Sequence, residues 1–236
     1  MDCPRPEKWG ISAELSPLFG GHRNTTLRSR GLEQNVVFKS TRRSPAAIGW
    51  LEAVHYHARQ AGFIVPYFIR SQSGQLIEDG WTCETYLDGQ QIAQVDLPYI
   101  RSKLMMFHES ASGLAQRPGF LSSVDLLHQS TGGDVDLSAM PEQVVRRCRD
   151  AWEAVADRRE GVIHGDLNVG NVLRTADGQF ALIDWDEARR DLLLYDLGHL
   201  AADDEAGNRA RLAWETACSW ILEPAHARAL AARLLN

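Results

Sequence analysis

Two short polar segments in the second half of the chain restrict the possible folds more than any other feature. The first is residues 164–171, His-Gly-Asp-Leu-Asn-Val-Gly-Asn, and the second is residues 181–186, Ala-Leu-Ile-Asp-Trp-Asp. Each contains or follows a short β-like stretch, and both lie between segments whose apolar residues have helical spacing. Polar residues that interrupt a helical pattern in this way predict a loop and a strand end that carry a chemical site.

The residue types and spacing in these segments suit phosphoryl transfer. Residues 164–171 match the kinase catalytic-loop pattern H-R-D-L-x-x-x-N at every specified position except the arginine, which is Gly165 here. Asp184 stands where the same set of patterns expects the aspartate of D-F-G. Phosphoryl transfer needs magnesium, a carboxylate that accepts the proton of the attacking hydroxyl, and positive charge on the phosphates. We therefore predict Asp166 as the base, and Asn171 and Asp184 as oxygen ligands of Mg²⁺.

The positive charge is predicted to come from the first part of the chain. Lys39 ends the run Val-Val-Phe-Lys, in the place of the lysine in the V-A-I-K pattern. In the helix predicted to start after Ser44 and to close at Gly62, the only acidic residue is Glu52. The sequence thus predicts an ion pair between Lys39 and Glu52.

Two further segments are predicted to bind the nucleotide. The turn at Gly20-Gly21 lacks the three-glycine spacing of G-x-G-x-x-G, but its backbone N–H groups could still approach a phosphate. Glu84 to Tyr86 precede Asp88-Gly89 and are predicted to form a hinge whose backbone meets adenine.

The pattern along the chain predicts two lobes. Strands are predicted at 11–19, 25–30, 35–40, 65–71 and 75–87, with one helix among them, which makes residues 1–88 a five-stranded nucleotide-binding lobe. From Leu97 onward the apolar spacing is helical, so residues 89–236 are predicted to be a mainly helical lobe with the catalytic loop and the acceptor site.

Composition excludes several classes of function. The chain has 236 residues, 44% of them hydrophobic, and a formal net charge of -6, so no basic field favours nucleic acid. Its four cysteines lie far apart and predict reduced thiols rather than a zinc site or a disulfide scaffold. No apolar run approaches the length of a membrane span, and we expect a cytoplasmic protein without a membrane partner.

These residues resemble the aminoglycoside phosphotransferase and choline kinase superfamily, whose hallmark is H-G-D-x-x-x-x-N followed by I-D-W or I-D-F. The resemblance implies an α+β, two-lobed protein-kinase-like fold, with a small antiparallel-sheet lobe and a mainly helical lobe. It implies that Asp166 is the catalytic base, that Asn171 and Asp184 hold Mg²⁺, and that Lys39 and Glu52 orient ATP. The step Asp196-Leu197-Gly198 is similar to the one whose aspartate buttresses the catalytic loop in such families.

We expect a small-molecule kinase that uses ATP, and two alternatives remain. A catalytically silent nucleotide-binding protein that acts through a partner is one. A protein kinase is the other, disfavoured by Gly165 and by the lack of an A-P-E segment.

The acceptor is predicted to be a small cationic or polyhydroxylated molecule, such as an aminoglycoside, an amino alcohol or a sugar. Residues 89–236 carry 22 acidic and 15 basic residues, whereas residues 1–88 carry 9 and 10. The acids that follow Asp184 are predicted to line the acceptor pocket: Asp186, Glu187, Asp203, Asp204, Glu205 and Glu215. The preference for ATP or GTP and the oligomeric state stay open.

Overall fold

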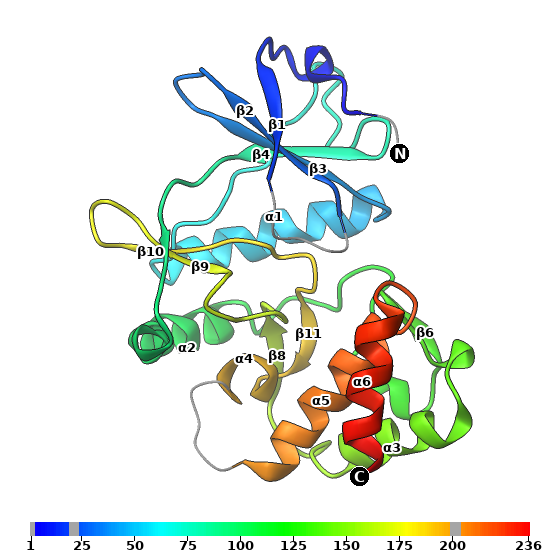
Figure 1. The fold of residues 1–236 in the computed structure, drawn as a ribbon. Coiled ribbons are helices and arrows are strands. Elements are labelled where there is room, and N and C mark those ends of the chain that lie inside the picture. Colours follow the sequence, from blue (N-terminus) through cyan, green and yellow to red (C-terminus); the bar gives the residue numbers. More distant parts are fainter. Residues whose placement is uncertain (1–2, 19–23, 199–203) are drawn as a thin grey trace.

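The protein, seen here in a computed structural model that describes residues 3–18, 24–198 and 204–236, has two lobes (Figure 1). The first lobe holds a four-stranded antiparallel sheet in the order β1-β2-β3-β4. Its elements are η1 (Pro6–Trp9), β1 (Glu14–Pro17), β2 (Thr26–Arg30), β3 (Val36–Ser40), α1 (Pro45–Gln60) and β4 (Trp81–Thr85).

The two faces of the sheet have different roles because side chains alternate along each strand. Val36 and Phe38 of β3 face a small apolar cluster with Trp9 and Cys83. Lys39 therefore points to the opposite face, toward the second lobe. The alternation of β3 is what brings a lysine into the space between the lobes.

Helix α1 lies between the sheet and the second lobe (Figure 1). The Ser44 side chain accepts a hydrogen bond from the N–H of Ala47, and Pro45 occupies the first helical position, as such a sequence favours. Its buried stripe includes Ile48, Leu51 and His55. The helix thus presents an apolar and neutral face to the core.

The prediction of five strands in this lobe was wrong. Residues 65–71 form no strand; they pair with β4 through one isolated bridge between Phe68 and Glu84. The N–H of Tyr67, which would continue a ladder to β4, donates to the Thr85 hydroxyl instead of a backbone carbonyl. Of the long predicted strand 75–87, only Trp81–Thr85 is regular.

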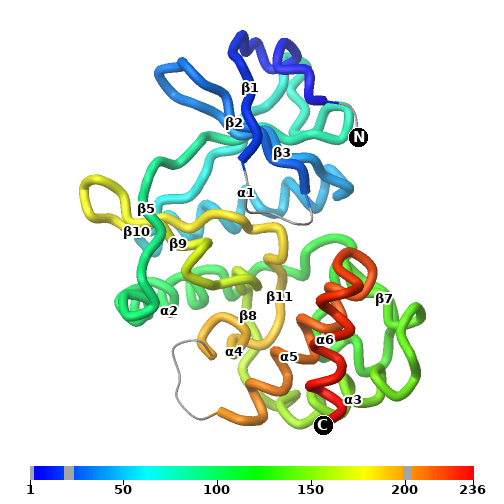
Figure 2. Tube along the Cα trace, in the orientation of Figure 1, coloured from blue at the N-terminus to red at the C-terminus, as the bar shows by residue number. Residues whose placement is uncertain are grey.

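The second lobe is mainly helical, as predicted, and its helices pack around two apolar clusters. The Cα trace shows α5 (Glu205–Ser219) and α6 (Pro224–Leu235) side by side near the C-terminus (Figure 2). Its elements are β5 (Gln90–Gln91), η2 (Gln94–Ile100), α2 (Arg101–Ser110), η3 (Asp125–Leu127), β6 (Thr131–Gly132), β7 (Val135–Asp136), η4 (Leu137–Ala139), α3 (Glu142–Glu153), β8 (Glu160–Ile163), β9 (Val172–Arg174), β10 (Phe180–Leu182), β11 (Arg189–Leu192), α4 (Leu194–Leu197), α5 (Glu205–Ser219) and α6 (Pro224–Leu235).

Short strands in this lobe place the two polar segments. β8 pairs with β11, and β9 pairs with both β10 and β5. The catalytic-loop residues lie between β8 and β9, and Asp184 follows β10. Because β9 and β10 form a hairpin, the two polar segments emerge near each other below the sheet of the first lobe (Figure 1).

The α+β two-lobed architecture confirms the predicted fold class. A division of the chain at residue 88 stays a prediction, although β4 ends at Thr85 and β5 already pairs within the second lobe. Among the described residues, no helix has both the length and the apolar character needed to cross a membrane.

Candidate active site

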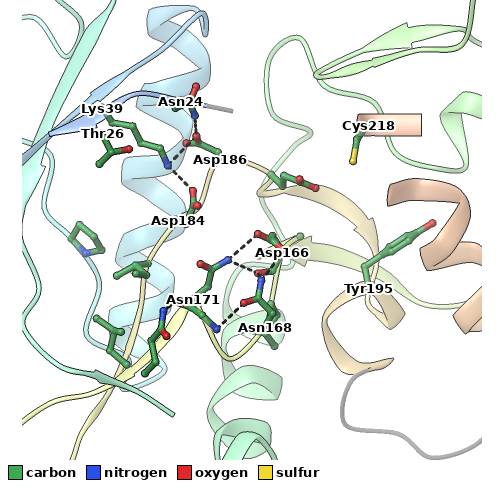
Figure 3. Close-up of a pocket in the computed structure, with 18 of the residues that line it drawn as sticks. Asn24, Thr26, Lys39, Asp166, Asn168, Asn171, Asp184, Asp186, Tyr195 and Cys218 are labelled. Atoms are coloured by element: carbon green, nitrogen blue, oxygen red, sulfur yellow. Dashed lines mark hydrogen bonds and ion pairs between the residues drawn. The ribbon is translucent and has the colours of Figure 1, made fainter. Parts of the chain in front are cut away.

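A cleft of about 990 Å³ lies between the lobes and contains most of the predicted site residues. Figure 3 shows Lys39, Asp184 and Asp186 together on one side, with Asp166, Asn168 and Asn171 close by. Ligand sites are commonly about 300–1,000 Å³, so the cleft has room for a small molecule together with part of a nucleotide.

The catalytic loop is held from beneath by Asp196 of α4, which is fully buried. Its carboxylate accepts hydrogen bonds from the backbone N–H groups of His164, at 2.8 Å, and Gly165, at 3.0 Å. His108 of α2 lies 3.0 Å from the same carboxylate. Burial alone would favour the neutral acid, but these hydrogen bonds hold the pKa of Asp196 below its usual value. The predicted buttress is therefore present.

His164 is fully buried, and both of its ring nitrogens have partners within the site. Its Nε2 lies 2.9 Å from the carbonyl oxygen of Ile183, and its Nδ1 accepts from the N–H of Asp166 at 3.4 Å. Burial lowers the pKa of His164, which favours the neutral ring. The imidazole thereby ties the catalytic loop to the segment that carries Asp184.

Gly165 has a structural reason to be glycine. Its φ of +87° is in the left-handed region, and a Cβ there would collide with the carbonyl oxygen of Glu187. An arginine does not fit this backbone. The departure from H-R-D is thus a property of the local conformation.

Two asparagines orient Asp166. The Nδ2 of Asn168 donates to Oδ1 at 2.9 Å, and the Nδ2 of Asn171 donates to Oδ2 at 2.9 Å. Hydrogen bonds to a carboxylate favour its charged form. The arrangement places an oriented carboxylate in the wall of the cleft (Figure 3).

Asp184 and Asp186 converge on Lys39 from the second lobe. The ammonium lies 2.5 Å from Asp184 and 2.9 Å from Asp186, and Asn24 donates to Asp186. Asp184 has a φ of 62°, a conformation that non-glycine residues rarely adopt and that is concentrated at functional sites. Burial would lower the pKa of Lys39, but Asp186 and Asp184 hold it above its usual value.

The predicted ion pair between Lys39 and Glu52 was wrong. Glu52 lies on the outer side of α1, where its carboxylate pairs with Arg70 at 2.6 Å, and its side chain is 37% exposed. The helix residues that approach Lys39 around a small cavity are Ile48, Leu51 and His55. Glu52 does not line the cleft.

The residues of the predicted hinge line the cleft, Glu84 and Tyr86 among them. Two of its N–H groups are already used: Thr85 donates to the Tyr67 carbonyl and Tyr86 to the Asn35 carbonyl. Apolar side chains from both lobes also line the cleft, and together they are called the apolar slot below: Leu18, Val37, Pro66, Leu87, Leu173 and Ile183. The Gly20-Gly21 turn lies outside the described residues.

A model of the phosphotransferase enzyme family (APH) matches residues 14–230. The chain belongs to this family. The match covers most of the chain, including both polar segments and Lys39, and it confirms the predicted superfamily and the prediction of a phosphotransferase enzyme. A search of curated proteins found no sequence match.

Solved structures of this family share the fold. Choline kinase LicA from Streptococcus pneumoniae aligns with a TM-score of 0.63 and 15% identity, over 98% of this chain and 96% of that one. A thermostable aminoglycoside phosphotransferase APH(4)-Ia in complex with ADP and hygromycin B gives 0.62 and 14%, over 98% and 96%. Spectinomycin phosphotransferase APH(9)-Ia, in complex with ADP and spectinomycin, gives 0.60 and 11%, over 95% and 86%. At these identities the likeness shows the fold alone.

One wall of the cleft is built mainly by α5, with a contribution from α6. Of the predicted acids, Glu187 and Glu215 line it, and Glu223 is a further one that the sequence analysis missed. Two basic side chains, Arg211 and Arg233, lie in the same wall. The wall is therefore mixed in charge, with more acids than bases.

Two of the predicted acids, Asp204 and Glu205, do not line this wall. Asp204 caps α5 through the N–H of Gly207 and pairs with Arg158, and Glu205 is exposed in the first turn of the same helix. Neither lines the cleft. Asp203 lies outside the described residues.

Arg117 is a site residue that the sequence did not indicate. Its side chain is 1% exposed and donates to the carbonyl oxygens of Asp186, at 2.8 Å, Ala188, at 3.1 Å, and Ala47, at 3.2 Å. It thus fixes the backbone beside Asp184 against α1. Asn24 was missed as well, and in both cases a single polar residue in a loop carries no recognisable pattern.

The donor chemistry around Asp184 fits Mg²⁺. Two carboxylates share one cationic group, the Lys39 ammonium, and the Asn171 amide oxygen offers a neutral ligand nearby. No group of three or more His, Cys, Asp or Glu side chains among the described residues could hold a metal by itself. Mg²⁺ is usually held by one or two carboxylates with substrate phosphates, so this set is of the expected kind.

Proposed function

We propose that the protein transfers the terminal phosphoryl group of ATP to a hydroxyl of a small molecule, in a Mg²⁺-dependent reaction. The observation that carries this is the position of Asp166, which two amides hold in the same cleft that the apolar slot and the wall of α5 and α6 line. Phosphoryl transfer depends mostly on such positioning and on charge neutralisation.

The apolar slot suits the base of the nucleotide. Val37 and Leu173 come from different lobes and lie on the slot wall, and Leu87 offers the next N–H along the chain after the two used within the sheet. Tyr86 is held by the Arg28 guanidinium, 3.5 Å from its ring centroid. The base of the nucleotide would lie beside the predicted hinge, Glu84 to Tyr86.

Lys39, Asp184 and Asn171 line the same cleft as the apolar slot and Asp166, and the triphosphate would lie against them. Mg²⁺ held by Asp184 and Asn171 would neutralise charge on the triphosphate. Lys39 would bind phosphate oxygens in exchange for its present carboxylate partners. Asp166 would accept the proton of the acceptor hydroxyl as that oxygen forms its bond to phosphorus and ADP leaves.

The acceptor would sit against Glu187, Glu215 and Glu223. With more carboxylates than guanidinium groups, and with the three aspartates of the cleft nearby, this wall favours a cationic or polyhydroxylated molecule. Two of the related solved structures contain hygromycin B and spectinomycin, and a third is a choline kinase. These compounds are the first acceptors to test.

The test is turnover of MgATP against a panel of acceptors at low and high salt. The panel contains spectinomycin, hygromycin B, gentamicin, choline, a neutral sugar and a phosphorylated sugar. We expect phosphorylation of a cationic acceptor, with a KM that rises with salt because exposed charges are screened beyond about 8 Å at physiological ionic strength.

Each part of the proposal can fail separately. A phosphorylated sugar as the best acceptor, or a KM that is indifferent to salt, would contradict the acidic acceptor wall. Binding of MgATP without turnover of any acceptor would favour the catalytically silent alternative. Absence of nucleotide binding would exclude both.

A further inference from the structure

Helix α1 supplies no carboxylate partner for Lys39, although kinases commonly use a helix glutamate to hold this lysine in place. Its two present partners, Asp184 and Asp186, both belong to the second lobe, and Asp184 is a proposed Mg²⁺ ligand. A lysine that binds phosphates needs a carboxylate on its own side of the cleft to keep its ammonium in place.

Helix α1 offers no such group. Its only carboxylate, Glu52, is turned outward to Arg70, and the residues that face Lys39 are apolar except for His55. His55 is 1% exposed, and burial lowers its pKa to about 3, so the ring is neutral. The helix therefore presents no charge to Lys39.

The neighbouring strand does offer a carboxylate. Lys39 pairs in register with Thr82, and Val37 pairs with Glu84, so Glu84 is the diagonal neighbour of Lys39 on the same face of the sheet. Diagonal side chains lie about 7–8 Å apart at their Cα atoms and can interact when they are long. Both residues also line the cleft and the small cavity beside α1.

Glu84 is distinctive among the acids of its lobe. Of the carboxylates in residues 3–18 and 24–88, it alone lines the cleft. Its side chain shares with Lys39 one face of the sheet, the cleft and the small cavity beside α1. The two side chains are therefore placed to interact across the pair of strands.

We propose that Glu84 of β4 is the positioning residue for Lys39 and replaces the helix glutamate of other kinases. The proposal rests on the function proposed above, in which Lys39 binds phosphates. Because β3 and β4 are adjacent strands of one sheet, this pairing does not depend on where α1 lies. The lysine would keep its orientation while its bonds to Asp184 and Asp186 are exchanged for phosphates.

The test compares Glu84→Gln with Glu52→Gln, its matched control on the outer face of α1. For Glu84→Gln we expect the affinity for ATP to fall by about tenfold, while that for adenosine, which has no phosphates, stays at the wild-type value. GTP, if it binds, should lose as much as ATP. Glu52→Gln should bind both ATP and adenosine like the wild type.

Two further variants complete the experiment. Glu84→Asp, which keeps the charge, should recover part of the loss, and thermal unfolding will show whether each variant is folded. Lys39→Met with Glu84→Gln should bind ATP no more weakly than Lys39→Met alone, because both changes remove the same interaction.

Several results would overturn the proposal. One is that Glu84→Gln binds ATP with wild-type affinity although Lys39→Met binds it more weakly than the wild type. Another is an equal loss for adenosine, or a loss confined to one base, since either would mean that Glu84 acts on the base slot. A failure of the wild-type protein to bind ATP would instead refute the proposed function itself.

Discussion

The catalytic loop and the segment that carries Asp184 and Asp186 lie together in the cleft, but they are held in different ways. The catalytic loop is held by hydrogen bonds from its backbone N–H groups to Asp196, a fully buried carboxylate of the same lobe. The backbone of the Asp184 segment is likewise held within the second lobe, by His164 and Arg117, but its two carboxylates pair across the cleft with Lys39 and Asn24 of the first lobe.

This difference separates a rigid part of the site from an adjustable part. Bonds within one lobe keep their geometry however the lobes move, so Asp166 stays in place before any substrate binds. Ion pairs across the cleft tie the position of the Asp184 segment to the first lobe. They can be exchanged when a nucleotide brings its own charges, which suits a segment that would bind metal and phosphates.

The largest effect should come from the rigid part. Replacing Asp166 with Asn removes the proposed base while keeping the side chain's size, so turnover should fall by about 10²- to 10⁴-fold. ATP affinity should change little, which calorimetry can measure alongside the rate. Turnover within about threefold of wild type would refute the role of Asp166.

A second large effect is expected at the buttress. Asp196→Asn leaves the buried N–H groups of His164 and Gly165 and the His108 ring with fewer acceptors, and the loss of a buried hydrogen-bonded charge should cost about 3 kcal/mol of unfolding free energy. Urea denaturation checks this. If stability is unchanged, the loop is held by something other than Asp196.

A change in the adjustable part, the Asp184 segment, should alter the dependence of ATP affinity on Mg²⁺. In Asp184→Ala, the gain in ATP affinity on adding Mg²⁺, expected to be at least about tenfold in the wild type, should disappear. The measurement is ATP titration with Mg²⁺ and with EDTA. A gain that persists would show that another carboxylate, most plausibly Asp186, is the main ligand.

The smallest effect is expected for stability at Asp186. Its pair with Lys39 is partly solvated, with side-chain exposures of 27% and 15%, so Asp186→Asn should cost no more than about 1 kcal/mol. The same urea experiment applies. A loss as large as that for Asp196→Asn would remove the distinction drawn between the two segments.

The sequence alone predicted which residues gather at the centre of the site. Asp166, Asn171 and Asp184 sit in short local patterns, a loop after one strand and the end of another, whose geometry depends on neighbours in the chain. Lys39 could be found in the same way, because strand alternation decides which face it takes. These residues all line one cleft, as their order and spacing predicted.

Only the tertiary structure decided which groups meet them. Successive helix residues are rotated by about 100°, so the single step from Leu51 to Glu52 turns the side chain away from Lys39 and toward Arg70. The partner of Lys39 depends instead on the register of β3 against β4, two strands that are joined through α1 and a long irregular segment. Likewise, Asp204 is drawn from the cleft by its cap on α5 and by Arg158. Local patterns can specify a side chain's chemistry, but its partners depend on how distant elements pack.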